Sequence, residues 1–304
     1  MSTSDASDLL GVDLSEHAAR AVVVDPTGRV TGRASGACAR PAEIADIARA
    51  AAREAGLARP RLVGVAIGGE ATPADVKTVV TSLQRAWDGA TPVHTVAWGA
   101  AYALGEFWCG AARGATNVVA FSLGEQVSAG LILDGRLWTG SHDLAGSVAW
   151  LALNPVERED YRKLGCLEAE VGSSGIVRRL VWRIKAGDHS RVLDAAGGDL
   201  SAVTLDHVLA GARDGDGVAI SVIRDTVKYL GMAVANLAAT VDPEVVVLGG
   251  TVHAAGDLLL EPIRTEAARR MPPAAAAAVR IELAALGAEA PAFGAARYAL
   301  DHHS

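Results

Sequence analysis

The sequence predicts a two-domain α/β protein, and three observations carry this prediction. Short apolar runs typical of strands occur in two pairs, at 9–14 with 19–24 and at 117–122 with 130–133. Each pair lies near a glycine-containing turn and leads into helical periodicity. A uniformly apolar run at 245–248 is typical of a strand buried on both faces. The chain has 304 residues, 50% of them hydrophobic, which is enough to form two cores.

Local signals predict the elements of the first half in order. The turn at 25–28, Asp-Pro-Thr-Gly, ends the second strand. Apolar residues at helical spacing predict a helix over 44–55. Two further apolar runs, at 62–67 and 93–97, predict strands, and 100–109 predicts the helix that follows them.

The second half repeats this order with longer helices. The dipeptide Asp134-Gly135 predicts a hairpin turn between two strands. Helical stretches dominate 167–239, and the clearest helix is expected at 218–240. Asp242-Pro243 ends that helix, because the residue before a proline disfavours helical backbone angles. An alanine-rich helix from about Phe293 closes the chain.

Composition limits the classes of function. The net charge is −7 and no basic run stands out, so we expect no nucleic-acid partner. The three cysteines are far apart and odd in number, which favours a reducing compartment over a disulfide framework. The first residues, MSTSDASD, lack the features of a signal peptide, and no apolar stretch of about 18 residues indicates a membrane span. We therefore expect a cytoplasmic protein without a membrane partner.

Motifs along nearly the whole chain resemble those of the ROK proteins (repressor, open reading frame, kinase), which are bacterial sugar kinases and related repressors. The matching stretches are Gly11-Val-Asp13, Gly64-Val-Ala-Ile-Gly-Gly69, Ala103-Leu-Gly-Glu106, Asp134-Gly-Arg-Leu137, Gly165-Cys-Leu-Glu168, Asp242-Pro-Glu-Val-Val-Val-Leu-Gly-Gly250 and Gly294-Ala-Ala296. The resemblance implies the actin-like ATPase (ribonuclease H-like) fold, with two domains about a central cleft. It implies a small domain of residues 1–112 joined by the final helix 295–304, a large domain of residues 113–294, and a homodimer.

The chain departs from the family at the chemistry of sugar phosphorylation. The resemblance places the family's Asn-Asp pair, whose Asp is the base, at Ala97 and Trp98. An indole has a donor N–H and no proton acceptor, so Trp98 cannot be a general base. Ser147 replaces a sugar-binding Glu, and Trp150 replaces a His that binds sugar or zinc. Glu168 alone matches a sugar-binding carboxylate of the family.

The zinc motif of the family is also incomplete. Its two leading cysteines fall on Glu159 and Tyr161, and only Cys166 remains. A tetrahedral structural zinc site needs four ligands, and one thiolate cannot hold the ion. The sequence therefore predicts a protein without zinc.

The two phosphate loops that the resemblance implies have lost most of their glycines. Such loops use glycine so that backbone N–H groups can approach anionic oxygens. The first loop carries Glu16 near its tip and the second carries Glu125, which places negative charge beside phosphates. The residues that persist for nucleotide binding are Asp13, Gly124, Gly249 and Gly250. Binding of ATP with magnesium is therefore doubtful, although the resemblance allows it.

Other residues could replace the lost chemistry. His94, His142, Asp143 and Glu168 are the candidate acids or bases, since imidazoles and carboxylates exchange protons. A lone histidine is more often structural, and this alternative stays open for each one. Trp98 and Trp150 either line an aromatic pocket or plug a disused cleft. In the first case the ligand pocket comprises Ala97, Trp98, Ser147, Trp150 and Glu168.

Three functional hypotheses follow. The first is a pseudokinase, a ROK-like protein that does not phosphorylate hexoses, whose interdomain cleft binds another small molecule or serves another reaction, for example in bacterial specialised metabolism. The second is an active sugar or aminosugar kinase with rearranged residues, in which Asp13 would hold magnesium. The third is a partner-binding or regulatory protein. The first expected strand begins at Leu9, so we expect no DNA-binding domain before it.

Overall fold

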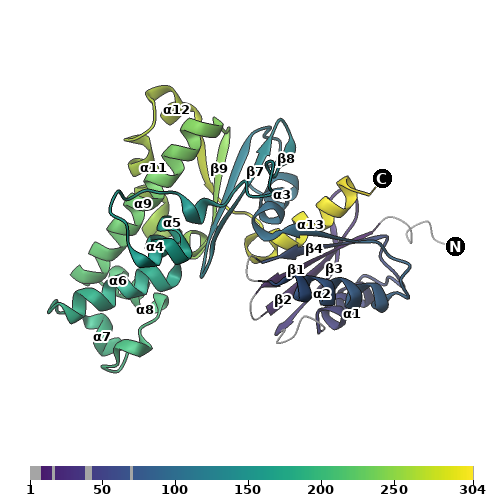
Figure 1. Cartoon of the computed structure of the whole chain (residues 1–304), viewed down its shortest axis with the longest axis horizontal. Coiled ribbons are helices and arrows are strands. Elements are labelled where there is room, and N and C mark those ends of the chain that lie inside the picture. The colour runs from purple at the N-terminus through teal and green to yellow at the C-terminus, as the bar shows by residue number, and fades with distance from the viewer. Residues whose placement is uncertain (1–7, 16–17, 38–42, 69–70, 304) are drawn as a thin grey trace. The chain divides into compact units, whose positions relative to one another are not determined.

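The computed structural model describes residues 8–15, 18–37, 43–68 and 71–303. The chain divides into two compact units (Figure 1). The first unit comprises Met1–Ala120, Gly130–Gly146 and Ala284–Ser304, and the second comprises Phe121–Ala129 and Ser147–Leu283. This division differs from the boundaries expected from the sequence mainly because residues 130–146 and 284–294 group with the first unit.

A five-stranded sheet forms the centre of the first unit. Its strands are β1 (Leu9–Ser15), β2 (Ala18–Val24), β3 (Val30–Ala37), β4 (Leu62–Ile67) and β5 (Val93–Ala97), in the spatial order β3-β2-β1-β4-β5. The first three strands are antiparallel neighbours, whereas β1, β4 and β5 are parallel. The carboxyl ends of these three parallel strands therefore meet at one edge of the sheet.

Helices cover both faces of this sheet, as Figure 1 shows. The helices of the first unit are α1 (Ile44–Glu54), α2 (Pro73–Ala86), α3 (Trp98–Cys109) and α13 (Ala290–Asp301), with the 3₁₀ turn η4 (Gly287–Glu289) before α13. Leu10 and Val12 of β1 belong to the core cluster with α1 and α2, whereas Leu9 packs with Phe293 of α13. The two clusters follow the period-two alternation of strand side chains.

Helix α13 lies unusually close to its neighbours because glycines face it. A Cβ atom on Gly11 of β1 or on Gly64 of β4 would lie 1.8 Å from a carbonyl oxygen of α13. Gly294 within α13 meets α3 in the same way, since its Cβ would lie 1.7 Å from the carbonyl oxygen of Ala101. The backbone of α13 is thus in direct contact with two strands and one helix.

Replacing Gly294 by alanine is expected to lower the free energy of unfolding by about 1–3 kcal/mol, because α13 must shift away from α3. Gly217→Ala is the matched control, since an added Cβ at that helical position meets nothing within 4 Å. Urea unfolding of both variants measures the difference. Equal stabilities of the two variants would contradict the close approach of α13 and α3.

The second sheet has the order β10-β9-β6-β7-β8. Its strands are β6 (Val118–Leu123), β7 (Val127–Leu133), β8 (Arg136–Trp138), β9 (Val245–Gly250) and β10 (Arg280–Leu283). Asp134 and Gly135 have φ angles of 50° and 72° between β7 and β8, as the predicted hairpin turn requires. The strand expected at 130–133 begins three residues earlier, at Val127.

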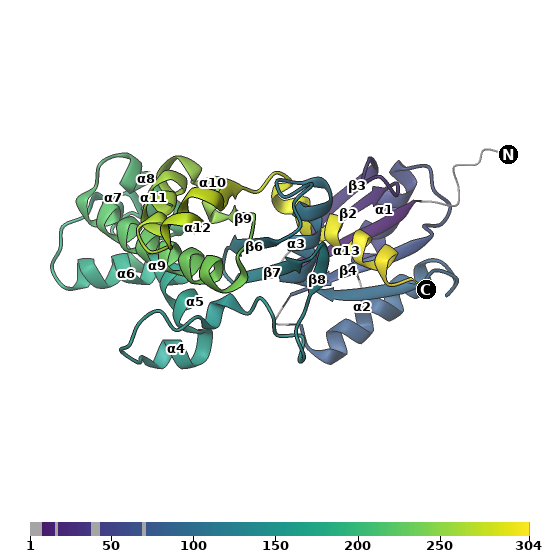
Figure 2. The same ribbon diagram turned by 90° about the horizontal axis from the view of Figure 1, so that it is seen from above.

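Helices form most of the second unit. They are α4 (Glu159–Leu164), α5 (Cys166–Val171), α6 (Ser173–Lys185), α7 (Arg191–Ala195), α8 (Leu205–Arg213), α9 (Gly217–Val241), α10 (Thr251–Ala254), α11 (Gly256–Ala268) and α12 (Pro273–Ala278), with 3₁₀ turns η2 (Val148–Trp150) and η3 (Leu200–Ala202). The long helix α9 contacts α5, α6, α8 and α11, and Figure 2 shows it among these helices.

The ends of α9 match the sequence signals. Asp216 caps its N-terminus by accepting a hydrogen bond from the Ala219 N–H, and Asp242 ends it with a left-handed φ of 49° before Pro243. Within the described residues, no helix is both long enough and apolar enough to span a membrane.

Candidate functional site

The site implied by the family resemblance begins where β1 and β5 end. Asp13 lies on β1, opposite Ala66 of β4, and Trp98 is the first residue of α3, directly after β5. The parallel sheet brings these two side chains together although 85 positions separate them. The indole Nε1 of Trp98 donates a hydrogen bond to Oδ1 of Asp13 at 2.9 Å. Trp98 therefore acts as a donor at the place where the resemblance puts the base.

Asp13 is almost fully enclosed, with 1% of its surface exposed. Arg20 lies directly opposite it in the β1–β2 ladder, and the Arg20 Nη1 is 3.7 Å from the Asp13 Oδ2. Burial raises the pKa of Asp13 to about 7, although the Trp98 hydrogen bond and the Arg20 charge both oppose this shift. The Asp13 carboxyl group thus gains and loses its proton near neutral pH. The tip of this hairpin, including Glu16, lies outside the described residues.

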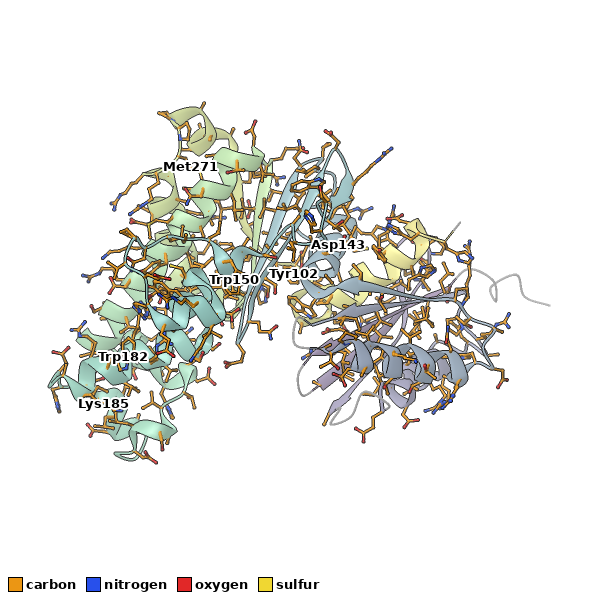
Figure 3. The ribbon with its side chains drawn as sticks, in the orientation of Figure 1. Tyr102, Asp143, Trp150, Trp182, Lys185 and Met271 are labelled. Atoms are coloured by element: carbon orange, nitrogen blue, oxygen red, sulfur yellow. The ribbon has the colours of Figure 1, made fainter. Side chains whose placement is uncertain are left out.

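Packing holds the Trp98 ring in place. It stacks on Tyr102, one turn further along α3, with ring centroids 5.5 Å apart and an interplanar angle of 10°. Trp98, Leu137 and Tyr298 all pack against a small core cluster that includes Ala66 and Ala101. Tyr102 is buried (Figure 3), and its hydroxyl has no hydrogen-bond partner among the described residues. One face and the polar atom of the indole are therefore already engaged within the first unit.

The second predicted phosphate loop is a turn between β6 and β7. The carbonyl oxygen of Gly124 accepts a hydrogen bond of 2.9 Å from the N–H of Ser173, at the start of α6. The N–H of Val127 donates to Oε2 of Glu168 at 2.8 Å. Glu125 is exposed at the turn. One amide that a phosphate could use is thus bonded to a carboxylate of α5.

The glycine pair after the buried strand β9 has a packing role. Gly249 is buried, and Gly250 adopts φ 62° and ψ −127°, a conformation that side chains disfavour. A Cβ on Gly250 would lie 1.8 Å from the carbonyl oxygen of Leu123 on β6. Close contact between β9 and β6 is a sufficient reason for glycine at position 250, whether or not a nucleotide binds there.

Three of the four candidate acids and bases, His94, His142 and Asp143, lie in the first unit, and Glu168 lies in the second. His94 is near the start of β5, and its ring lies edge-on to that of His303, with centroids 6.0 Å apart. Burial lowers the pKa of His94, and the nearby His303 and His302 lower it further. The other two candidates of this unit, His142 and Asp143, are exposed in the loop after β8.

The remaining members of the predicted ligand pocket come from both units. Ala97 is exposed at the end of β5, next to Trp98, in the first unit. Ser147 directly precedes the 3₁₀ turn η2 in the second unit, and Trp150, labelled in Figure 3, is the last residue of that turn. Trp150 is 58% exposed. Trp150 therefore offers an aromatic surface, whereas Trp98 is partly enclosed.

The positions that correspond to the zinc motif form a different structure. Glu159 is exposed and pairs with Lys163 along α4 at 2.7 Å. Tyr161 and Cys166 pack together in a small apolar cluster with Ala169. Across the described part of the chain, no group of three His, Cys, Asp or Glu side chains is arranged to hold a metal ion.

Two contacts of the site were not predicted from the sequence, although the sequence contained a signal for the first of them. Arg20 pairs with Asp13 because both are equally far from the hairpin tip, so the hairpin length alone indicates their pairing. The bond between Glu168 and the Val127 amide had no local signal, since it joins a helix to a turn 41 positions away.

The fold and the site define the class of protein: a two-unit α/β fold with sheets of the kind found in actin-like sugar kinases. Two solved structures cover the chain almost completely at 24% identity. They are a ROK hexokinase from Thermus thermophilus (TM-score 0.79, covering 98% of this chain and 100% of that one) and a ROK glucokinase from Streptomyces griseus in complex with glucose and AMPPNP (TM-score 0.76, covering 97% and 99%). These similarities show the actin-like ATPase fold.

The chain belongs to the ROK family, whose profile matches residues 73–302. A curated glucokinase from Halalkalibacterium halodurans is 34% identical over 195 residues. That match covers 63% of this chain and 58% of the glucokinase, so the chain spans less than two thirds of that relative's length.

Proposed function

We propose that this chain is a ROK-family pseudokinase that binds a small molecule and does not transfer phosphate from ATP to a hexose. The bond from Trp98 to Asp13 is the observation that carries the proposal. A base must accept the proton of the sugar hydroxyl, and the indole at this position only donates. The carboxylate it contacts is buried and is partly protonated at neutral pH.

The nucleotide side supports the same proposal. Phosphoryl transfer depends on positioning and on stabilising the charge of the phosphates. The amide of Val127 is already bonded to Glu168, and Glu125 adds negative charge at the same turn. A bound Mg²⁺ would require an ionised Asp13, which burial disfavours below about pH 7. The proposal therefore includes neither an obligatory nucleotide nor zinc.

The proposed ligand is flat or apolar in part, because tryptophans stand where the family resemblance puts two polar residues. Trp150 is an exposed aromatic residue, and Ala97, Trp98, Ser147 and Glu168 are the other residues that we propose for ligand binding. Aromatic side chains favour ligands that present an apolar face. We also propose that the protein works as a cytoplasmic homodimer with no nucleic-acid partner.

An active kinase is the second candidate, and one observation favours it. A carboxyl group with a pKa of about 7, such as that of Asp13, is suited to proton transfer near neutral pH. Asp13 could serve as the base only if the Trp98 indole moved away from it. A glucokinase among the relatives agrees with this alternative.

Calorimetry with ATP and Mg²⁺, and ADP release in the presence of glucose or N-acetylmannosamine, separate the two candidates. We expect no heat of nucleotide binding and no turnover by the wild-type protein. The double variant A97N/W98D restores the base and should remain inactive, because the Val127 amide is still bonded to Glu168. A ROK glucokinase assayed in parallel shows that the conditions support turnover.

Sugar-dependent turnover by the wild-type protein would overturn the proposal. Activity of the double variant alone would show that only the base is missing and that the phosphate loops are competent. The ligand is sought by thermal shift against sugars and aryl glycosides, and each hit is repeated with Trp150→Ala. The absence of any hit, or hits that Trp150→Ala does not weaken, would overturn the assignment of the pocket.

A further inference from the structure

A buried carboxylate, that of Glu170, lies at the centre of a polar network within the second unit. Glu170 of α5 is 2% exposed. It accepts hydrogen bonds from the Tyr161 hydroxyl at 2.5 Å and from the Arg158 Nη1 at 2.9 Å, and the Arg179 Nε lies 3.6 Å from its second oxygen. A lone buried carboxylate is strongly unfavourable, so these three partners are what makes the position tolerable.

The partners of Glu170 connect it to four other parts of the unit. The Tyr161 hydroxyl also accepts a hydrogen bond from Asn154 Nδ2 at 3.1 Å, and the same Nδ2 donates to Tyr229 of α9 at 3.2 Å. The Arg179 Nη2 donates to the backbone carbonyl of Glu170 at 2.7 Å and to the Thr226 hydroxyl of α9. The network thus joins the loop after η2, α4, α5, α6 and α9.

An outer layer closes the network toward solvent. Asp160 pairs with both Arg158 and Arg178 at 2.8 Å. The two guanidinium groups lie over the ring of Trp182, 5.4 Å and 5.1 Å from its centroid. Trp182 is half-exposed on α6 (Figure 3). We define the Glu170 network as Asn154, Arg158, Asp160, Tyr161, Glu170, Arg178, Arg179 and Trp182.

The segment that this network holds has little regular structure of its own. Residues 151–165 contain only the six-residue helix α4. Such a short helix is marginal in isolation, so tertiary contacts must fix it. Tyr161, which the family resemblance aligns with a zinc cysteine, supplies one of these contacts through Glu170.

Helix α5 connects the network to the candidate site. Glu168 and Glu170 are two residues apart on this helix, so they point in different directions. Glu170 points into the network, while Glu168 accepts the N–H of Val127 at the turn between β6 and β7. Any shift of α5 that loosens Glu170 therefore also moves the carboxylate that holds the turn.

We propose that the Glu170 network holds residues 151–165 in one conformation without a metal ion. Through α5, it also positions Glu168 against the turn at 124–126. Glu170 is a positioning residue in this proposal. Retaining a buried ion pair in place of apolar side chains brings no large gain in stability, but it specifies one arrangement of the elements it joins. The inference is independent of whether the protein transfers phosphate.

Amide hydrogen exchange of the full chain tests this proposal without any ligand. In Glu170→Gln we expect the amides of residues 151–165 and of Val127 to exchange at least tenfold faster than in the wild type, on the order of the loss of one charged hydrogen bond. The α9 amides of 230–238 should keep their protection. Excess EDTA should leave exchange in the wild-type protein unchanged.

Two control variants test whether the network acts on Glu168 and not the reverse. Glu159→Gln removes a carboxylate from the exposed pair with Lys163 on the same short helix and should change nothing. Glu168→Gln should accelerate Val127 and leave 151–165 protected, because Glu168 acts downstream of the network. If Glu170→Gln does not fold, Tyr161→Phe removes only the hydroxyl and takes its place in the experiment.

Three outcomes would overturn the proposal. Uniform acceleration across the second unit would show that Glu170 affects only global stability. An unchanged Val127 amide together with a loosened 151–165 would separate the network from the site. Opening of 151–165 by EDTA in the wild-type protein would mean that a metal ion, and not the network, holds the segment.

Discussion

Replacing Asp13 by asparagine is expected to raise the free energy of unfolding at pH 8 by on the order of 4 kcal/mol. The pKa of Asp13 is raised from 3.8 in the unfolded chain to about 7 in the folded protein, chiefly by burial. Between these values the folded state binds more protons than the unfolded state. Wild-type stability therefore falls as the pH rises from about 4 to about 7.

The Asp13→Asn variant lacks this loss because its side chain cannot ionise. The asparagine oxygen can still accept the Trp98 indole hydrogen bond, so the contact that closes the site is kept. The difference between variant and wild type should be small at pH 4, grow up to about pH 7 and remain constant above it. The variant also loses the ion pair with Arg20. This loss makes the increase in the free energy of unfolding smaller, but the variant is still more stable than the wild type at pH 8.

Urea unfolding at a series of pH values measures this effect. Asp46→Asn is the matched control, because Asp46 is an exposed residue of α1 in the same unit and pairs with the neighbouring Arg49. The control should follow the wild-type curve. Parallel curves for wild type and Asp13→Asn would show that Asp13 stays ionised in the folded protein, which would favour the magnesium-binding role of the alternative kinase.

Replacing Glu106 by alanine is expected to lower the free energy of unfolding by about 3–5 kcal/mol. Glu106 is fully buried near the end of α3. Its carboxylate accepts three backbone N–H groups, from Ala111 at 2.9 Å, Ala285 at 3.0 Å and Leu286 at 2.9 Å. Truncation removes the partner of all three part-buried donors and leaves a cavity in place of the buried carboxylate. An unpaired buried donor costs about 1–3 kcal/mol.

The Glu106→Gln variant should lose less stability than Glu106→Ala. Its amide oxygen can still accept hydrogen bonds at the position of one carboxylate oxygen, while its NH₂ group, at the position of the other, faces a backbone N–H donor. Glu289→Ala is the control: it removes a partly exposed carboxylate of the same unit, paired with Arg33, and should change stability by less than about 1 kcal/mol. Denaturant titrations rank the three variants. A Glu106→Ala protein as stable as the control would contradict the anchoring role of this carboxylate.

Local patterns were sufficient for the strands that carry the site. Apolar runs predicted β1, β2 and β4 because these strands are largely buried and have few polar positions. The prediction also found β5, although only Val96 of that strand is buried. The same reasoning did not predict β3, whose sequence VTGRASGA has no apolar run and which forms by pairing with β2. It also did not predict β10, which has only four residues.

Several helices escaped prediction, and for α2 the signals were present. Helix α2 begins with a reciprocal cap between Thr72 and Asp75 and with Pro73 at its first position, which is a strong start signal. The final helix begins at Ala290, slightly before the expected Phe293. In both cases the ends of helices depend on capping and on neighbouring elements more than on apolar spacing.

The sequence by itself determined the family and the two-part α/β organisation, and it predicted the residues at which this chain departs from a sugar kinase. These are properties of short motifs, and each motif can be recognised from consecutive residues without knowledge of the fold. An indole lacks a proton acceptor in any fold, so the prediction that Trp98 is not a general base needed no structure.

The tertiary structure alone shows what several of these side chains contact. Trp98 donates to Asp13, Glu168 holds the Val127 amide, and Glu170 gathers Tyr161 and two arginines. The first two contacts join residues 85 and 41 positions apart, so they depend on which strands pair, in which register, and on how closely the helices pack on them. Burial then sets the charge of Asp13, because the pKa of a carboxyl group depends on its surroundings and not on its neighbours in sequence.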